Sequence, residues 1–333
     1  MSAILIALAA ALGSATLTAL VIRYARLSSM HDAPGARRMH LRPTVRGAGL
    51  GFALTILAGW AAFGWSLGIE QPLGRWGLAT ALALAVVAPV SWLDDHAGLP
   101  VWPRLLAHGL GALLIALAGA SYLPWMVAAA ALLVLVACTN FWNFIDGING
   151  MAASQSLVLA IGVALVAWWL GDYPLAWFAA LMAGALAAFL PFNFPHARAF
   201  MGDVGSASLG LVCGALLLAP LEDGSAWWVV LPLASAVLLD TGLTLLWRMS
   251  RRPLRRWYTG HREHLYQWLA RSGWGHTRTT LAYLGWALGP GLAVVWTGLA
   301  RPELRLIATV LLYLAGALIW RLGRDYALAR RRA

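Results

Sequence analysis

The segment NFWNFIDGING carries more patterned polar groups than its surroundings, in a chain that is 61% hydrophobic. Its amide and carboxylate side chains recur every three residues, at Asn140, Asn143, Asp146 and Asn149. Residues at this spacing lie near one face of a helix or tight turn, so their oxygens would point toward a common ligand. The alternative is an asparagine-rich loop in which Gly147 and Gly150 form turns.

A pair of adjacent carboxylates, Asp94 and Asp95, lies in the segment SWLDDHAGLP at the end of an apolar run. The two charges repel each other and are unfavourable at the negative end of a helix dipole. A cation would relieve both problems, and carboxylate oxygens are the ligands that Mg²⁺ prefers. The alternative is a solvated turn.

Asp203 lies in FMGDVGS, where a further apolar run begins. Free backbone N–H groups at a helix N-terminus favour a phosphate or a metal-bound anion. The alternative is that Asp203 or Ser206 is an ordinary N-cap.

Two basic segments have the composition of an anion site. The first, HDAPGARRMHLRPTVRG, contains Arg37 and Arg38 and two further arginines, which could bind phosphate through bidentate hydrogen bonds, or could only mark the inner side of a membrane. In the second, HREHLYQ, His261 and His264 are spaced to share a helical face beside Arg262. Two histidines without a nearby cysteine rarely bind zinc, so phosphate or sugar contact is the better functional hypothesis. A basic amphipathic helix on the membrane surface is its alternative.

The elements that must position these residues are membrane helices. Only 11% of the residues are charged, and apolar runs long enough to cross a bilayer recur along the chain. We expect an all-α, polytopic integral membrane protein of about eleven transmembrane helices, folded as one domain over residues 1–333. The expected spans are about 3–22, 48–68, 76–93, 104–120, 124–140, 152–170, 174–192, 206–220, 226–247, 279–298 and 304–321.

The basic residues orient this series. All 24 are arginine, and an outside N-terminus places 21 of them on the cytoplasmic side, as the positive-inside rule requires. The C-terminus is then cytoplasmic, and the net charge of +11 indicates anionic lipid or an anionic substrate rather than nucleic acid. The expected cytoplasmic segments, which hold the polar motifs, are 23–47, 93–104, 140–151, 193–206 and 248–278, followed by a basic tail, 321–333.

Asp240 is the one acid expected well inside a membrane span. A carboxylate there costs about 2.5–3.5 kcal/mol on insertion scales, so it should face a partner or a cavity. The sequence leaves open whether this partner is structural or functional.

Taken in order, the polar segments resemble those of one family, the polyprenyl-phosphate N-acetylhexosamine-1-phosphate transferases (glycosyltransferase family 4, grouped with MraY and WecA). The resemblance covers about residues 20–280 and rests on DAPGARRMHLRPTVRGAGL, DDHAG, NFWNFIDGINGMA, FMGDVGS and HREHLYQ. HREH differs from the triple-histidine cluster of the peptidoglycan enzymes, and Asn149 stands where some members have aspartate. The resemblance therefore leans toward enzymes that initiate O-antigen or other surface polysaccharides.

The resemblance implies a bacterial inner-membrane enzyme with a cytoplasmic active site. Undecaprenyl phosphate would attack a UDP-N-acetylhexosamine, releasing UMP and forming undecaprenyl-diphospho-sugar. Mg²⁺ is the expected cofactor, with Mn²⁺ as the alternative ion, and a homodimer is left open. The lipid bilayer is the expected surrounding, and no nucleic acid is expected as a partner.

The same resemblance implies a role for each candidate residue. Asp203 would be the principal metal ligand, completed by Asn143 or Asp146, and Asp94 and Asp95 would lie at the acceptor end, where one takes a proton or orients the attack. Asp146 joins this catalytic set. The expected substrate contacts are Asn140, Asn149, Arg37, Arg38, His261, Arg262 and His264. Direct attack and a covalent aspartyl intermediate stay open. The rival classes are a transporter or flippase with a polar vestibule, for which Asp240 is the only supporting residue, and a non-catalytic scaffold.

Overall fold

The computed structural model describes residues 2–32, 43–221, 224–251 and 261–330, and Arg37 and Arg38 lie outside this part. The helices are α1 (Ala3–Leu27), α2 (Leu50–Leu67), α3 (Pro72–Ala97), α4 (Val101–Gly119), α5 (Trp125–Ile145), α6 (Met151–Trp169), α7 (Tyr173–Asn193), α8 (Gly202–Leu218), α9 (Trp227–Arg251), α10 (Leu265–Leu269), α11 (Gly275–Trp286), α12 (Leu292–Ala300) and α13 (Arg305–Arg330). Two π-helical turns, Ala270–Trp274 and Ala287–Gly291, and a 3₁₀ turn, Pro302–Leu304, join the last helices. Two antiparallel pairs of two-residue strands complete the structure: β1 (His31–Asp32) with β2 (Thr44–Val45), and β3 (Pro220–Leu221) with β4 (Gly224–Ser225).

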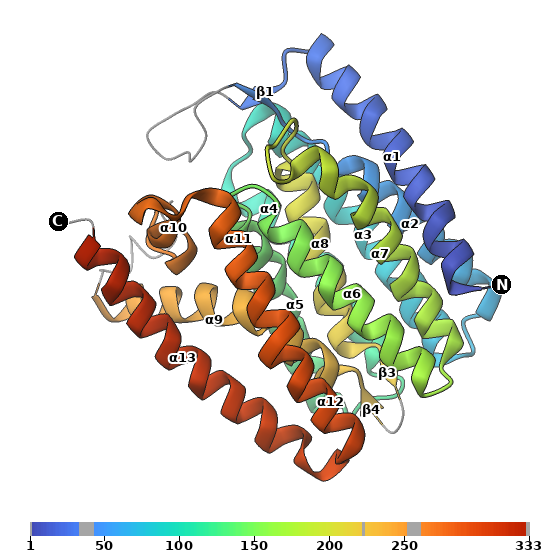
Figure 1. The fold of residues 1–333 in the computed structure, drawn as a ribbon. Coiled ribbons are helices and arrows are strands. Elements are labelled where there is room, and N and C mark those ends of the chain that lie inside the picture. Colours follow the sequence, from blue (N-terminus) through green and yellow to red (C-terminus); the bar gives the residue numbers. More distant parts are fainter. Residues whose placement is uncertain (1, 33–42, 222–223, 252–260, 331–333) are drawn as a thin grey trace.

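The expected membrane architecture is confirmed. Within the described ranges, ten helical segments are long and apolar enough to cross a bilayer, with Leu265–Ala300 counted as one, and the shorter apolar helix α8 is the eleventh segment. Helix α1 begins and α13 ends at opposite ends of the bundle (Figure 1), as an odd number of crossings requires. Which end faces the cytoplasm stays a prediction.

Helix α8 lies at the centre of the bundle, and the polar residue Asp203 lies in its first turn. It packs against α2, α3, α4, α5, α6 and α9, and nearly all of its residues are buried. Because other helices surround it, this helix does not need to match the full thickness of the bilayer. Its N-terminus is therefore fixed by protein on several sides.

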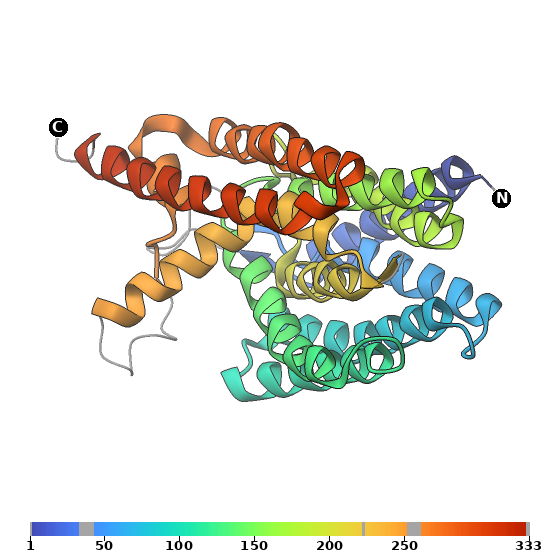
Figure 2. The same cartoon turned by 90° about the horizontal axis from the view of Figure 1, so that it is seen from below.

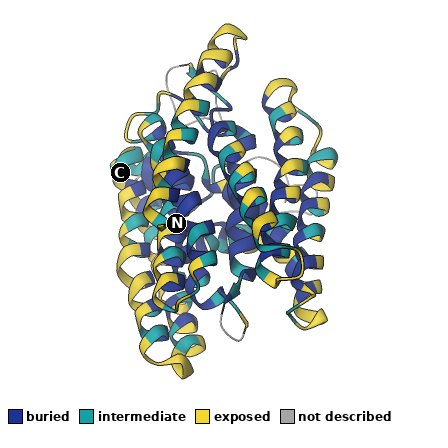
Figure 3. Ribbon diagram, turned by 90° about the vertical axis from the view of Figure 1, so that its right-hand side faces the viewer, coloured by how far each residue is buried: buried dark blue, intermediate teal, exposed yellow. Residues whose placement is uncertain are grey.

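The outer faces of the bundle are apolar. Large hydrophobic side chains are exposed along α1 and α13, for example Leu12 at 72% and Leu314 at 63%, and exposed positions follow the outer surfaces of the helices (Figure 3). In a water-soluble protein this much exposed apolar surface would be unfavourable. Lipid contact explains it, because a bilayer solvates such side chains.

The loops at the polar end are shorter than expected from the apolar runs. Helix α3 continues through both aspartates to Ala97, and α5 continues through Asn140 and Asn143 to Ile145. Polar residues can extend a helix beyond its apolar run, because the helix hydrogen bonds belong to the backbone. The segment 140–151 is therefore mainly a helix end, and only the residues from Asp146 to Gly150 form a turn.

Candidate active site

The carboxylate of Asp203, in the first turn of α8, is the centre of a polar cluster. Its Oδ1 accepts a hydrogen bond of 2.9 Å from Asn143 Nδ2 on α5 and lies 3.2 Å from a terminal nitrogen of Arg46. Its Oδ2 lies 3.5 Å from a terminal nitrogen of Arg104 on α4. Asn143 also donates to the Ser206 hydroxyl, at 3.0 Å. Three separate elements thus converge on one carboxylate.

Asp95 holds the N-terminus of α8 from the neighbouring helix α3. Its Oδ1 accepts the Asp203 N–H at 2.8 Å, and its Oδ2 accepts the Val204 N–H at 3.0 Å. Arg46 Nε lies 2.8 Å from the same Oδ1, and the Asp95 side chain is fully buried. Gly202 makes this approach possible: its φ is +73°, and a Cβ there would lie 2.4 Å from Asp95 Oδ2. The acid that caps α8 is thus Asp95, and the interpretation of Asp203 or Ser206 as the N-cap is wrong.

Asp94 ties the ends of α3 and α4 together. Its Oδ1 accepts the Leu99 N–H at 2.6 Å, and its Oδ2 lies 3.0 Å from Arg104. The alternative of a solvated Asp-Asp turn is wrong, because both side chains are buried and paired. The cations that offset these two acids here are Arg46 and Arg104.

A cavity of about 240 Å³ opens beside this cluster. Oxygen-bearing side chains dominate its wall, which is lined by Asp32, Arg46, Asn143, Asp146, Gly147, Ile148, Asn149, Asn193, Phe200, Gly202, Asp203, Ser206, Gln267 and His276. Burial, together with the negative charges of Asp203 and Asp95, raises the pKa of Asp146 well above its usual range. Its carboxylate accepts no hydrogen bond from any part of the chain that the structure describes, so it is available to a ligand.

Asn140 and Asn149 have different positions. Asn140 donates back to the Val136 carbonyl at 2.7 Å on its own helix and does not line the cavity. Asn149 lines it, with its side chain donating to the Pro195 carbonyl at 2.9 Å. Of the predicted three-residue pattern, Asn143, Asp146 and Asn149 therefore come together and Asn140 does not.

The HREH residues lie outside this cavity. His264 is buried beside Asp240, with its ring stacked on that of His261, and Arg262 is not among the lining residues. Burial, the neighbouring His264 and Arg248 lower the pKa of His261 to about 4, and burial lowers the pKa of His264. Both rings are therefore neutral at pH 7, so they could contact a diphosphate by hydrogen bonds but would not add charge. From this part of the chain, the cavity receives Gln267 and His276 instead.

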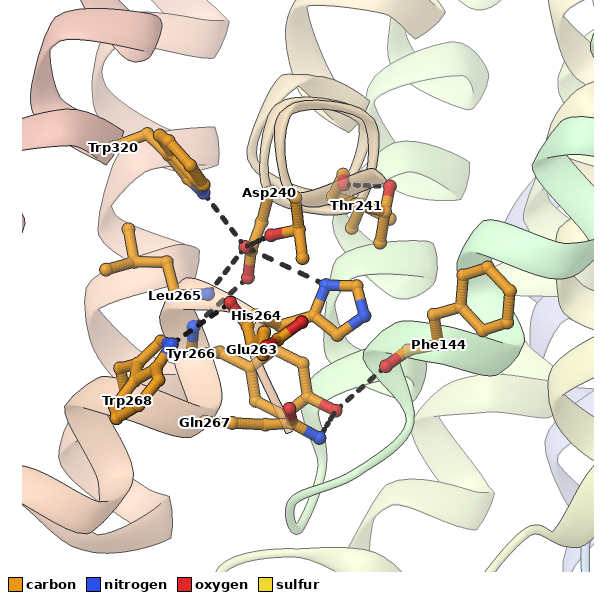
Figure 4. A network of polar contacts seen from close by, with 12 residues as sticks. Phe144, Asp240, Thr241, Glu263, His264, Leu265, Tyr266, Gln267, Trp268 and Trp320 are labelled. Carbon is orange, nitrogen blue, oxygen red and sulfur yellow. Dashed lines mark hydrogen bonds and ion pairs between the residues drawn. The ribbon is translucent and has the colours of Figure 1, made fainter. Parts of the chain in front are cut away.

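Asp240 is a structural residue that positions the segment containing these histidines (Figure 4). Its carboxylate accepts the Leu265 and Tyr266 N–H groups, at 2.7 and 3.1 Å, which begin α10. The other donors are side chains from three helices: Thr244, Tyr283 and Trp320. The buried acid thus joins α9, α10, α11 and α13, which answers the question that the sequence left open.

We expect Asp240→Ala to lower the free energy of unfolding by at least about 3 kcal/mol, because several buried donors lose their acceptor. Thermal unfolding in detergent micelles measures this loss. Asp172→Ala is the matched control: Asp172 accepts one N–H at the start of α7, that of Leu175, and such a cap contributes about 1 kcal/mol. Equal losses in the two variants would contradict the structural role of Asp240.

Sequence reasoning missed several residues of the carboxylate cluster and of the cavity beside it. Arg104 was seen only as part of the arginine distribution, although it is a lone charge at the start of an apolar run directly after DDHAG. Arg46 was included in the first basic segment without a role of its own. Gln267 follows HREH by three residues, and this proximity was the available signal. His276 offered none.

The side chains on the cavity wall carry oxygen ligands of the kind that Mg²⁺ prefers. Three carboxylates, Asp32, Asp146 and Asp203, and the amide of Asn143 lie on the wall of one cavity. Because Asn143 donates through its nitrogen to Asp203, its carbonyl oxygen is directed away from that carboxylate. No group of three or more His, Cys, Asp or Glu side chains with metal-site geometry occurs in residues 2–32, 43–221, 224–251 and 261–330. Mg²⁺ keeps several waters and needs few protein oxygens, so this set fits the ion.

The chain is similar in sequence to known proteins. A model of the family described as "Glycosyl transferase family 4" matches residues 77–220, which include Asp94, Asp95, Asp146 and Asp203. The chain is 36% identical over 171 residues to the phospho-N-acetylmuramoyl-pentapeptide-transferase of Moorella thermoacetica, covering 50% of each chain. It is 28% identical over 295 residues to the decaprenyl-phosphate N-acetylglucosaminephosphotransferase of Mycobacterium tuberculosis H37Rv, covering 76% of this chain and 72% of that one. The expected resemblance is confirmed: residues 77–220 match glycosyl transferase family 4, and both relatives support similarity to MraY/WecA-like transferases.

Proposed function

We propose that this protein transfers N-acetylhexosamine-1-phosphate from a UDP-sugar to undecaprenyl phosphate in the bacterial inner membrane. The observation that carries the proposal is the cluster of carboxylates and arginines beside an oxygen-lined cavity at one end of a membrane bundle. The names of both relatives support a sugar-phosphate transfer, and that of the mycobacterial enzyme includes decaprenyl phosphate, a polyprenyl phosphate. The reaction would be the first membrane step of a surface polysaccharide, with O-antigen the pathway that the histidine segment favours.

In the proposed reaction, a phosphate oxygen of the lipid attacks the phosphorus that carries the sugar. A new P–O bond forms to the lipid phosphate, the bond from that phosphorus to the bridging oxygen breaks, and UMP leaves with the bridging oxygen. Phosphoryl transfer depends mainly on positioning and charge neutralisation. Arg46 and Arg104, already placed against Asp203, would neutralise the diphosphate, and Asn149 would contact the nucleoside.

Mg²⁺ would be held by Asp203 and Asp146, with Asn143 orienting the Asp203 carboxylate through its hydrogen bond, and it would supply positive charge to the phosphate oxygens. Burial and the neighbouring acids raise the pKa of Asp146, which favours uptake of a proton by its carboxylate. Asp95 would act by positioning, since its oxygens already hold α8 and Arg46. Asp94 would keep Arg104 beside the acceptor.

The arginine distribution supports an active site on the cytoplasmic face. Cytoplasmic segments carry the excess of basic residues in membrane proteins, and the cluster lies where α3, α5 and α7 end and α4, α6 and α8 begin. A transporter is the weaker candidate. Its one supporting residue was Asp240, whose carboxylate is saturated by five hydrogen bonds.

The test uses purified protein with undecaprenyl phosphate and a panel of UDP-sugars. We expect UMP release with a UDP-N-acetylhexosamine, dependent on the lipid and abolished by a chelator until Mg²⁺ is restored. Omission of the lipid is the control for simple hydrolysis. If no UDP-N-acetylhexosamine gives turnover, the enzyme proposal is rejected.

A further inference from the structure

Gln267, in the short helix α10, presents a buried polar group to the cavity. The residue is only 8% exposed, it lines the cavity, and its Oε1 has no hydrogen-bond partner among the residues that the structure describes. None of the roles proposed above uses it. Its neighbours decide which end of its carboxamide faces the cavity.

The orientation of the carboxamide follows from the Tyr266 hydroxyl. This hydroxyl donates its single proton to the Phe144 carbonyl, at 2.8 Å. It can therefore only accept from Gln267, whose Nε2 lies 3.2 Å away (Figure 4). Amide nitrogen and oxygen are often difficult to distinguish, but here the Tyr266 proton fixes the assignment. The oxygen must be the unpaired end.

This arrangement is built into the fold. Asp240 holds the Tyr266 N–H, and Tyr266 reaches across to the end of α5. Gly147 permits the approach, because a Cβ there would lie 2.1 Å from the Tyr266 hydroxyl. A buried acceptor without a donor is unfavourable, so a fixed carbonyl oxygen at a cavity wall is suited to a ligand that brings the donor.

We propose that Gln267 is a specificity-determining residue whose Oε1 accepts a hydrogen bond from an N–H group of the nucleotide-sugar. The inference rests on the proposed function and deepens it. A UDP-N-acetylhexosamine carries two such groups, the uracil imide N–H and the acetamido N–H of the sugar. Both present the same chemistry to a carbonyl oxygen, and the experiment distinguishes them. A site that hydrogen-bonds a substrate N–H discriminates against an analogue lacking it, because its own polar group is then left unpaired.

The test measures the dissociation constants of UMP and of a UDP-N-acetylhexosamine by calorimetry, with kcat/KM as a second readout. Gln267→Met keeps the length of the side chain and removes the acceptor. Gln155→Met is the matched control, since Gln155 is a buried glutamine in α6 that does not line the cavity. We expect about a ten- to hundredfold weaker affinity for the UDP-sugar in Gln267→Met and at most a threefold change in Gln155→Met.

Ligand analogues identify the group and need no variant. If Oε1 accepts the imide N–H, Gln267→Met loses as much affinity for UMP as for the UDP-sugar. N3-methylation of the uracil then produces the same loss of affinity in the wild type. If it accepts the acetamido N–H, UMP binding is unchanged and the loss appears with a UDP-2-deoxyhexose. In either case, Gln267→Met and the wild type have equal affinity for the analogue that lacks the recognised N–H group.

Two outcomes overturn the inference. In the first, Gln267→Met binds and turns over substrate as well as Gln155→Met does. In the second, Gln267→Met binds both analogues more weakly than the wild type by the same factor as it binds the UDP-sugar, which would show a structural effect only. Failure of the proposed function is distinct: the wild type would then release no UMP, while calorimetry would still decide whether Gln267 recognises an N–H of the nucleotide-sugar. If the wild type binds neither nucleotide, both proposals are wrong.

Discussion

Asp203→Asn is expected to lower the rate of UMP release by about a thousandfold or more, which corresponds to about 4 kcal/mol of transition-state stabilisation. Asparagine keeps the shape of the side chain but removes the charge that Arg46 and Arg104 contact. In the proposed mechanism it also removes the principal ligand of Mg²⁺, an ion that stabilises charge on phosphate oxygens by several kcal/mol. Initial rates at saturating Mg²⁺ and donor measure the effect.

The control for this variant is Asp172→Asn, at the start of α7. Asp172 also lies at a helix N-terminus, where it accepts the Leu175 N–H, but it is not part of the cluster. It should retain most of the wild-type rate. Asp203→Asn should keep a cooperative thermal transition, which separates loss of chemistry from loss of fold. Near-normal turnover in Asp203→Asn would remove Asp203 from the site.

Asp95→Asn is expected to reduce both stability and activity. The carboxylate accepts from two α8 N–H groups and from Arg46 Nε, and its side chain is fully buried. The amide NH₂ of asparagine would have to face one of these donors, and Arg46 would lose part of its counter-charge. Breaking a buried pair from one side costs about 3–5 kcal/mol. We expect a loss of about this size in thermal unfolding and about a hundredfold loss of turnover.

The pH dependence of the residual activity separates positioning from proton transfer at Asp95. A residue that only holds α8 and Arg46 leaves the shape of the pH–rate profile unchanged, so Asp95→Asn should lower the profile at every pH without removing a limb. A stable Asp95→Asn enzyme that lacks one limb would contradict this. It would support the role that the sequence alone suggested, in which one acid of the DDHAG pair takes the phosphate proton.

The membrane class and the eleven helical segments could be predicted from the sequence because hydropathy is a property of consecutive residues. A run that spans the bilayer must satisfy its backbone within the helix, so composition and length nearly determine its structure. The motifs also indicated which end of the bundle carries polar chemistry, and Asn143, Asp146, Asn149 and Asp203 do line one cavity. Short spacings, such as the three-residue repeat, transfer directly to one helix face or turn.

The pairing between helices was decided only by the tertiary structure. Asp94 and Asp95 are adjacent and chemically identical, yet Asp95 caps a helix that begins more than a hundred residues later, while Asp94 pairs with Arg104. The role of Asp240 follows only from its contacts with the start of α10. These contacts place Gln267, rather than the HREH histidines, at the cavity. The sequence thus determined the class of the molecule and the types of groups in its site. Which donor each carboxylate meets depended on contacts between segments far apart in the chain, which no local pattern encodes.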